Sequence, residues 1–179
     1  MIAYAITDPS TLHFKTLHSD LKRFSTKANI ILYRDKVTSY YASNAELFIT
    51  QAKKYNFDKV LLHTEYLLAH KIKADGVHLR STQFNDVEKA KALGLFVVIS
   101  THSLEEAQYA EKLGVDMVTF SPIFATPNKG EPKGIKALQR VVDRLSIPVI
   151  ALGGMVSLEH IRLSKESGAK GFASIRWFQ

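Results

Sequence analysis

Short runs of apolar, β-branched residues alternate along this chain with longer stretches in which apolar residues recur at helical spacing. The runs are eight candidate strands: Ile2–Ile6, Asn29–Arg34, Lys59–His63, Gly76–Leu79, Phe96–Ser100, Met117–Ser121, Pro148–Leu152 and Gly171–Ile175. Strands that alternate with helices predict a parallel sheet, because each helix carries the chain back to the end at which the next strand starts. Eight such units are the number that closes a (β/α)8 TIM barrel, so we predict this α/β fold.

The stretches between the strands carry the start and stop signals of helices. Ser103 followed by Glu106 predicts a capping box, in which the serine oxygen accepts from the Glu106 amide and the glutamate reaches back. Ser157 predicts a second cap of this kind. Glycines at 94, 114 and 168 follow predicted helices. Because a glycine just past a helix end readily adopts the left-handed conformation, these glycines predict where the helices stop.

An open dinucleotide-binding sheet is the competing architecture for such an alternation. Its G-x-G-x-x-G turn is absent, since the first glycine of the chain is Gly76. A chain of 179 residues leaves room for one domain. We therefore predict a single, minimal barrel domain over residues 1–179.

The eighth predicted strand ends at Ile175, and only residues 176–179 follow it. The final C-terminal helix of the barrel is therefore lacking. Either the barrel is open at this flank, or a partner subunit covers it. Trp177 and Phe178 are large apolar side chains that need burial, which favours the second alternative. We expect an exposed apolar flank around the first and last strands, covered in a homodimer.

The composition excludes several classes of protein. Cysteine is absent, which excludes a disulfide scaffold, cysteine-ligated zinc and iron–sulfur clusters. No apolar run reaches the roughly 18 residues of a membrane span, and the N-terminal segment lacks the charged region of a signal peptide. We expect a cytoplasmic protein with no membrane partner.

The charge balance points to an anionic partner. The chain has 24 Lys and Arg against 17 Asp and Glu, a net charge of +7. Such an excess suits nucleic acid, acidic lipid or a phosphorylated small molecule. The basic residues are scattered and form no run of five like charges, which is typical of solvated helix faces. We therefore expect a phosphorylated small-molecule ligand and no nucleic acid.

Polar residues at the carboxyl ends of the strands are the candidates for function, because barrel active sites lie there. The pair Gly153-Gly154 follows the seventh strand and lets backbone amides approach a phosphate closely. Arg176 follows the eighth strand and can bind the same group. Loops after strands seven and eight form the usual phosphate site of this fold, so we predict one here. A plain tight turn is the competing interpretation of the glycine pair.

Residues 122–134 form the longest predicted connection, with three prolines and two glycines. Long connections between a strand and a helix often act as lids over an active site. Lys129 and Lys133 lie in this loop, so we expect it to close over an anion. The alternative is a surface loop without a function.

Two histidines are candidate catalytic residues. His63 and His102 follow the third and fifth strands, where an imidazole exchanges protons near neutral pH. For His102 the competing role is to hold the loop before the capped helix. His78 alternates with Val77 and Leu79 on the fourth strand and so points into the barrel. We favour a buried, hydrogen-bonded core histidine at that position.

Five segments match a known pattern when they are taken together: Arg34-Asp35-Lys36, Gly76–Leu79, Ser100–Ser103, the loop with Pro122, Thr126 and Lys129, and Ala151–Met155. Together they resemble the thiamine phosphate synthase/TenI family, from end to end except for the final helix. The segments 5–8, 102–107 and 146–151 are more similar to the TenI-type branch.

This resemblance implies a (β/α)8 barrel, usually dimeric, that acts on precursors of thiamine. Thiamine phosphate synthases join a pyrimidine methyl diphosphate to a thiazole phosphate and release pyrophosphate, with Mg²⁺. By position, Arg34, Lys36 and Lys129 would contact the diphosphate, and Gly153-Gly154 the thiazole phosphate. The residues that we predict to bind phosphate or substrate are Arg34, Lys36, Ser100, Ser121, Thr126, Lys129, Gly153, Gly154 and Arg176.

The chain departs from the family pattern at positions that matter for the reaction. Thr64 and Gln83 stand where the synthase pattern has its Mg²⁺-ligating aspartates. Because a hard cation prefers carboxylate oxygens, we predict no metal ligands and no cofactor, with Mg²⁺ only if the chain is a synthase after all. Pro122 stands where TenI-type tautomerases have a histidine. His63 or His102 would have to take that role.

Three functional hypotheses follow. The leading one is a TenI-like protein of thiamine biosynthesis that binds a thiazole phosphate or a similar phosphorylated heterocycle, with metal-free isomerisation as its reaction if it is catalytic. The alternative is a thiamine phosphate synthase, because Arg34, Lys36 and Lys129 are present. The third is a non-catalytic binder or regulator that holds a phosphate ester without turnover.

Overall fold

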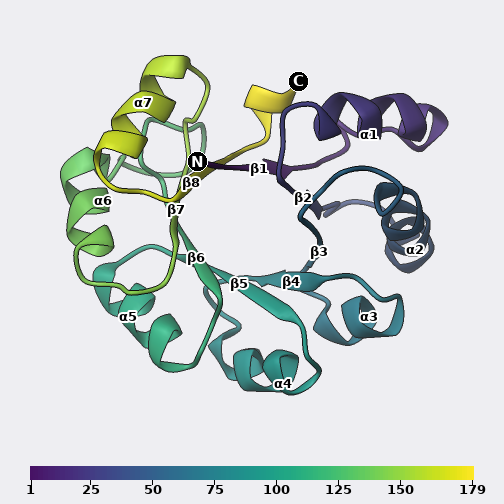
Figure 1. The fold of residues 1–179 in the computed structure, drawn as a ribbon, viewed down its shortest axis with the longest axis horizontal. Coiled ribbons are helices and arrows are strands. Elements are labelled where there is room, and N and C mark those ends of the chain that lie inside the picture. Colours follow the sequence, from purple (N-terminus) through teal and green to yellow (C-terminus); the bar gives the residue numbers. More distant parts are fainter.

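The computed structural model describes all 179 residues, along which eight strands alternate with seven α-helices (Figure 1). The strands are β1 (Ile2–Ile6), β2 (Ile30–Tyr33), β3 (Lys59–His63), β4 (Gly76–Leu79), β5 (Phe96–Thr101), β6 (Met117–Phe120), β7 (Val149–Leu152) and β8 (Gly171–Ser174). The helices are α1 (Leu17–Ser25), α2 (Tyr41–Ala52), α3 (Tyr66–Lys71), α4 (Val87–Ala92), α5 (Leu104–Lys112), α6 (Gly134–Val142) and α7 (Leu158–Glu166). Short 3₁₀ turns occupy η1 (Phe14–Thr16), η2 (Phe84–Asp86) and η3 (Arg176–Phe178). The predicted strands are confirmed, and no predicted end differs from the observed one by more than one residue.

The strands close into a barrel in sequence order. β8 pairs with β1 in parallel, with Ile2 opposite Gly171 and Ala5 opposite Ser174. The predicted (β/α)8 barrel is therefore confirmed, and the alternative of an open flank is wrong. Figure 1 shows the helices as a ring around the strands. In a ring of eight strands in this order, β3 lies across the barrel from β7, and β4 lies across from β8.

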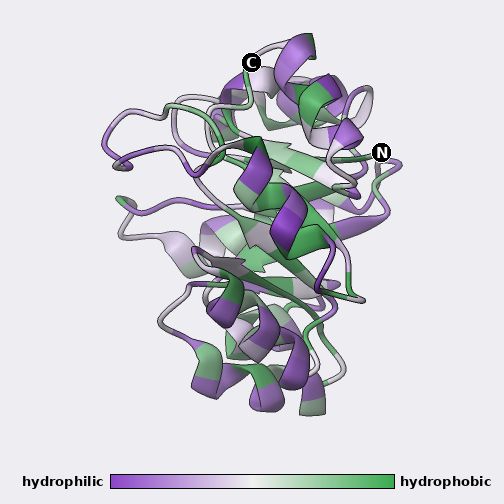
Figure 2. Ribbon diagram, turned by 90° about the vertical axis from the view of Figure 1, so that its left-hand side faces the viewer, coloured by the Kyte–Doolittle hydropathy of each residue, from purple (hydrophilic) through white to green (hydrophobic).

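Alternating side chains give the barrel two cores. Tyr4, Leu32, Leu61 and Val98 are among the nine buried residues that fill the barrel interior. The opposite faces of the strands pack against the helices in a larger cluster of 37 buried residues. In Figure 2 the apolar colour is concentrated on the central strands, and the hydrophilic colour is concentrated on the surrounding helices.

The predicted helix caps are present, with one difference. Ser103 Oγ accepts a hydrogen bond from the Glu106 amide at 3.1 Å, and Ser157 Oγ accepts one from the His160 amide at 3.1 Å. The Glu106 carboxylate accepts from the amide of His102 at 2.6 Å, one residue before the cap. The glutamate therefore holds the end of β5 as well as the start of α5.

The C-terminal turn η3 lies between α7 and α1, where the ring of helices would otherwise have a gap (Figure 1). Phe178 is completely buried and packs against Phe24 of α1 and Phe172 of β8, at centroid distances of 6.4 and 6.0 Å. Trp177 meets the Phe172 ring edge-on at 6.1 Å. The Arg23 guanidinium donates hydrogen bonds to the backbone carbonyls of Phe178 and Thr11. The chain thus buries its own C-terminal aromatic residues.

The expected apolar flank is therefore wrong: no large apolar side chain of β1 or β8 is exposed. The flank is not exposed because the turn η3 covers β8. The homodimer stays a prediction, since the burial of Phe178 no longer calls for a partner. None of the helices has the length and apolarity that a membrane crossing requires.

Candidate functional site

The carboxyl ends of the strands surround a cavity of about 700 Å³. This volume is typical of small-molecule sites. The residues predicted to be catalytic or to bind phosphate or substrate all line this cavity: His63, His102, Arg34, Lys36, Ser100, Ser121, Thr126, Lys129, Gly153, Gly154 and Arg176. Lys133, which was also expected to close over an anion, does not line it. Arg80, His78, Asp8 and Ser174 line it too. The sequence interpretation favoured a core role for His78 and assigned no binding role to the other three.

The cavity is strongly positive. Its lining includes five side chains that carry a permanent positive charge: Arg34, Lys36, Arg80, Lys129 and Arg176. Asp8 is the one acidic side chain of the lining, and its Oδ1 already accepts from the amide and hydroxyl of Ser10 at 2.9 and 2.7 Å. An excess of one charge in a concave site attracts ligands of the opposite charge. The charges of the lining therefore favour an anionic ligand.

Four of these cations form a group that we call the cationic cluster: Arg34, Lys36, Arg80 and Lys129. Arg34 and Lys36 follow β2, Arg80 follows β4, and Lys129 comes from the loop between β6 and α6. The charge of Arg34, partial burial, and the charges of Lys129 and Arg80 together lower the pKa of Lys36. Because like charges disfavour one another, this shift reports that the four side chains converge.

The tops of β7 and β8 offer backbone amides instead of side chains. Gly153, Gly154, Met155, Val156 and Ile175 all line the cavity, and no backbone amide of these five residues donates a hydrogen bond within the chain. Gly154 and Met155 are also buried. Unpaired amides that line a cavity can donate hydrogen bonds to the oxygens of an anion. We call these five residues the amide nest. Arg176 follows Ile175 of this nest at the end of β8.

The glycine pair also serves the loop that follows β6. Gly153 and Gly154 have φ values of +94° and +67°. A Cβ on Gly153 would lie 2.7 Å from Pro122 Cα, and one on Gly154 would lie 2.6 Å from Phe124 Cβ. The competing interpretation of this pair therefore has a physical basis, because only glycine lets the loop base pack so closely. The close packing of the glycine pair is compatible with amides that line the cavity, and the structure has both.

The base of the loop 122–134 is fixed to the barrel. Ile123 and Phe124 donate to the carbonyls of Leu152 and Gly153 at 2.9 and 3.1 Å. His160 stacks on the Phe124 ring at 3.9 Å, and its Nδ1 lies 2.6 Å from the Gly154 carbonyl oxygen. Lys133 donates to the Pro122 carbonyl at 2.8 Å and closes the other end. Residues 125–132 with Lys129 extend from this anchored base, and closure of this segment stays a prediction.

The three histidines differ in their surroundings. His102 is exposed, and its Nδ1 lies 2.9 Å from the Ser121 carbonyl oxygen, which supports its competing role of holding the loop. Burial, with His78, Arg34, Lys36 and Arg80 adding to it, lowers the pKa of His63 to about 3. Burial, with Arg34 adding to it, lowers the pKa of His78 to about 3. Both imidazoles are therefore neutral near pH 7.

His78 connects the barrel interior to the cavity. Its Nδ1 lies 2.8 Å from Tyr4 Oη, and its Nε2 lies 3.0 Å from Ser100 Oγ. Tyr4 is fully buried and its hydroxyl has no other partner, so its hydrogen is donated to Nδ1. A neutral imidazole then carries its hydrogen on Nε2 and donates it to Ser100. The Ser100 hydroxyl hydrogen is thereby left to point to a ligand in the cavity.

Replacing Tyr4 with phenylalanine should test this network. The change leaves Nδ1 of the buried His78 without a donor, so we expect the free energy of unfolding to fall by about 1–3 kcal/mol. Urea denaturation measures this difference. Tyr109→Phe, at a side chain that is 49% exposed, is the matched control and should be neutral. Equal stability of both variants would show that the Tyr4 hydroxyl makes no such contribution.

The donors around the cavity do not fit the Mg²⁺ ion that the resemblance implies. Gln83 Oε1 accepts from the backbone and Nε of Arg80 at 3.2 and 3.4 Å, and Thr64 Oγ1 donates to Glu65 at 3.3 Å. No group of three or more His, Asp or Glu side chains is placed to hold a metal ion. Magnesium requires several oxygen ligands, usually with one or two carboxylates. Asp8 alone, opposite five cations, does not supply them.

Three comparisons with known proteins agree on one family. The family model described as thiamine monophosphate synthase matches residues 3–178. The thiamine-phosphate synthase of Halalkalibacterium halodurans is 34% identical over 149 residues, 79% of this chain and 69% of the relative. That of Ruminiclostridium cellulolyticum is 27% identical over 179 residues, 96% of this chain and 84% of the relative. Among solved structures, thiamine phosphate pyrophosphorylase from Pyrococcus furiosus has a TM-score of 0.79 at 25% identity, over 97% of this chain and 85% of that one.

Proposed function

The chain belongs to the thiamine monophosphate synthase family, and from this premise we propose that it joins two phosphorylated precursors of thiamine, a pyrimidine methyl diphosphate and a thiazole phosphate. The observation that carries the proposal is that one cavity has a group of basic side chains on one side and a group of unpaired backbone amides on the other. Arg34, Lys36 and Arg80 lie at the ends of β2 and β4, and the amide nest lies at the ends of β7 and β8. Because β4 and β8 are on opposite sides of the barrel, the two regions face each other across its mouth.

Each region suits one of the two substrates. Four cations match the several charges of a diphosphate, and arginine binds phosphate oxygens with two parallel hydrogen bonds. The smaller amide nest, with Arg176 beside it, matches a single phosphate ester. With the pyrimidine diphosphate on one side and the thiazole phosphate on the other, the methylene carbon of the first and the ring nitrogen of the second would meet above the barrel interior. Holding both reactants in this way replaces an encounter in solution by a reaction within one complex.

The chemistry of the joining reaction fits these groups. The bond between the methylene carbon and the diphosphate oxygen breaks, and its electron pair leaves with the diphosphate. The methylene carbon, cationic at this point, forms a new bond to the thiazole nitrogen. The cationic cluster would stabilise the charge that develops on the departing diphosphate. The Ser100 hydroxyl, oriented by His78, would donate a hydrogen bond to an oxygen of the same group.

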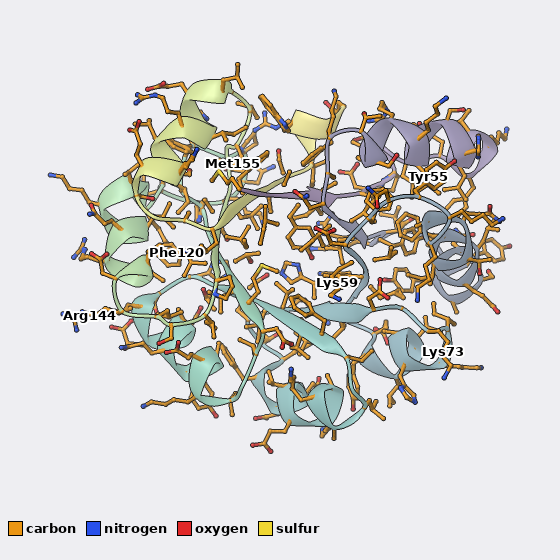
Figure 3. All side chains as sticks on the ribbon, in the orientation of Figure 1. Tyr55, Lys59, Lys73, Phe120, Arg144 and Met155 are labelled. Carbon is orange, nitrogen blue, oxygen red and sulfur yellow. The ribbon has the colours of Figure 1, made fainter.

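A substrate-specific change in the Michaelis constant is the test of this arrangement. We expect Lys129→Ala to raise KM for the pyrimidine diphosphate by about tenfold, and Arg176→Ala to raise KM for the thiazole phosphate to a similar degree, because each removes one charged hydrogen bond. In each variant KM for the other substrate should change little. The assay follows thiamine phosphate by chromatography. Arg144→Ala, which removes an exposed cation at the outer edge of the molecule (Figure 3), is the control for lost charge. Equal effects on both constants would contradict two separate anion sites.

A TenI-like isomerisation of a thiazole phosphate is the second candidate. Its support is the pair of neutral imidazoles of His63 and His78, 6.5 Å apart between ring centroids, below the anion sites. Such a reaction needs one phosphate site and no metal. It would be detected by NMR with the thiazole phosphate alone, whereas the joining reaction needs both substrates. Binding of the thiazole phosphate without turnover in either assay would favour the non-catalytic binder.

A further inference from the structure

The side chain of Gln83 ties Arg80 to the end of β3. Gln83 Oε1 accepts from Arg80 Nε at 3.4 Å and from the Arg80 amide at 3.2 Å. Gln83 Nε2 donates to the Thr64 carbonyl at 3.3 Å and to Asp86 Oδ2 at 3.2 Å. Both the oxygen and the nitrogen of the Gln83 side-chain amide are therefore hydrogen-bonded. Arg80 is otherwise an exposed side chain, so these bonds hold the start of its guanidinium group at the edge of the cavity.

The charges on this side leave no place for a divalent cation. A metal ion that bridged diphosphate oxygens would have to enter among Arg34, Lys36, Arg80 and Lys129. These side chains already repel one another, as the lowered pKa of Lys36 shows. The single acidic side chain of the lining, Asp8, follows β1 and is hydrogen-bonded to Ser10. A diphosphate alone would relieve this repulsion, whereas its magnesium complex carries less negative charge and would relieve it less.

We propose that the cationic cluster binds a diphosphate group without a divalent metal ion, with the Arg80 guanidinium as the counter-charge and Gln83 as the residue that positions it. The proposal rests on the proposed function for the identity of the substrate. Arginine suits this role because its planar group donates several hydrogen bonds to phosphate oxygens and stays charged at any physiological pH. The departing diphosphate would keep its electron pair and be neutralised by fixed side chains.

Calorimetric titration of the purified protein with inorganic pyrophosphate is the test. In the presence of EDTA the wild-type protein should bind, and replacing EDTA by excess Mg²⁺ should leave the affinity unchanged or weaker. In EDTA, Arg80→Ala should weaken binding by about tenfold or more, since it removes charged hydrogen bonds. Arg80→Lys should lose less, because it keeps the charge without the fork. Arg144→Ala, with the same loss of charge outside the cavity, should bind as the wild type does.

The positioning role of Gln83 is tested by the pyrophosphate affinities of Gln83 variants, with and without Arg80→Ala. Gln83→Leu should weaken pyrophosphate binding, and Gln83→Asn, which keeps the amide and adds no charge, should lose less. In the Arg80→Ala background, Gln83→Leu should have no further effect, because the side chain it positions is gone. Independent, additive losses from the two positions would refute this role.

Binding that requires Mg²⁺, or an Arg80→Ala variant that binds like Arg144→Ala, would overturn the proposal. The pyrophosphate titration does not test the proposed joining reaction, which is tested separately by the formation of thiamine phosphate. Thiamine phosphate formation that depends on Mg²⁺ would leave the joining reaction standing and refute the metal-free site. Metal-free pyrophosphate binding without thiamine phosphate formation would do the reverse.

Discussion

Replacing Phe178 with alanine is expected to lower the free energy of unfolding by about 3–5 kcal/mol, among the largest effects of any single substitution in this chain. The Phe178 ring is completely buried between Phe24 of α1 and Phe172 of β8. Its removal leaves a cavity beside the seam where β8 meets β1. Chemical denaturation with urea measures the loss.

Leu158→Ala is the control for this prediction. Leu158 is also a large apolar residue near the C-terminal part of the barrel, but its side chain is 75% exposed. Its truncation should change stability by less than about 0.5 kcal/mol. If Phe178→Ala were as mild as Leu158→Ala, the turn η3 would not be what closes the ring of helices, and another cover for β8 would be required.

Phe178 also shows where sequence reasoning about the fold stops. The strands and the caps at Ser103 and Ser157 are local features, because their pattern repeats within a few residues of the position concerned. Their positions were therefore predictable to within a residue. The contact between Phe178 and Phe24 joins the two ends of the chain and has no periodic signal. The number of strands could be predicted from the sequence, but the packing of η3 against α1 and β8 could not.

Some properties of the site could likewise be predicted from the sequence, and others could not. Residues directly after strands were predictable because all strand ends of a parallel barrel meet at one face. The charge state of His63 was not, since its low pKa depends on burial and on Arg34, Lys36 and Arg80 from other strands. The second task of Gly153 and Gly154, contact with the loop base, likewise depends on residues 122–125. A sequence shows which side chains reach the cavity, and their effects on one another require the structure.

Acid is expected to destabilise the protein strongly, through His63 and His78. Their pKa values of about 3 in the folded state lie well below the value of about 6.5 for an unperturbed histidine. Between these limits the unfolded chain binds protons that the folded chain does not, so the free energy of unfolding falls as the pH falls. Each histidine contributes about 1.4 kcal/mol per pH unit in this window. The stabilisation is fully present above about pH 6.5 and is lost progressively toward pH 3.

Urea denaturation at several pH values between 4.5 and 6 measures this slope. Partial burial raises the pKa of Asp20, but hydrogen bonds from His13, Thr16 and Arg23 lower it further, so that it lies below its usual value. The pH window lies above this pKa, and the Asp20 carboxylate therefore adds little to the slope. His63→Gln and His78→Gln should each remove about half of the slope, whatever they do to absolute stability, because each deletes one group that protonates on unfolding. His70→Gln, at an exposed imidazole on α3, removes a histidine without removing a buried one and should keep the slope. A slope that survives both buried substitutions would mean that carboxylates govern the acid transition and that the two imidazoles in the cavity are protonated in the folded protein.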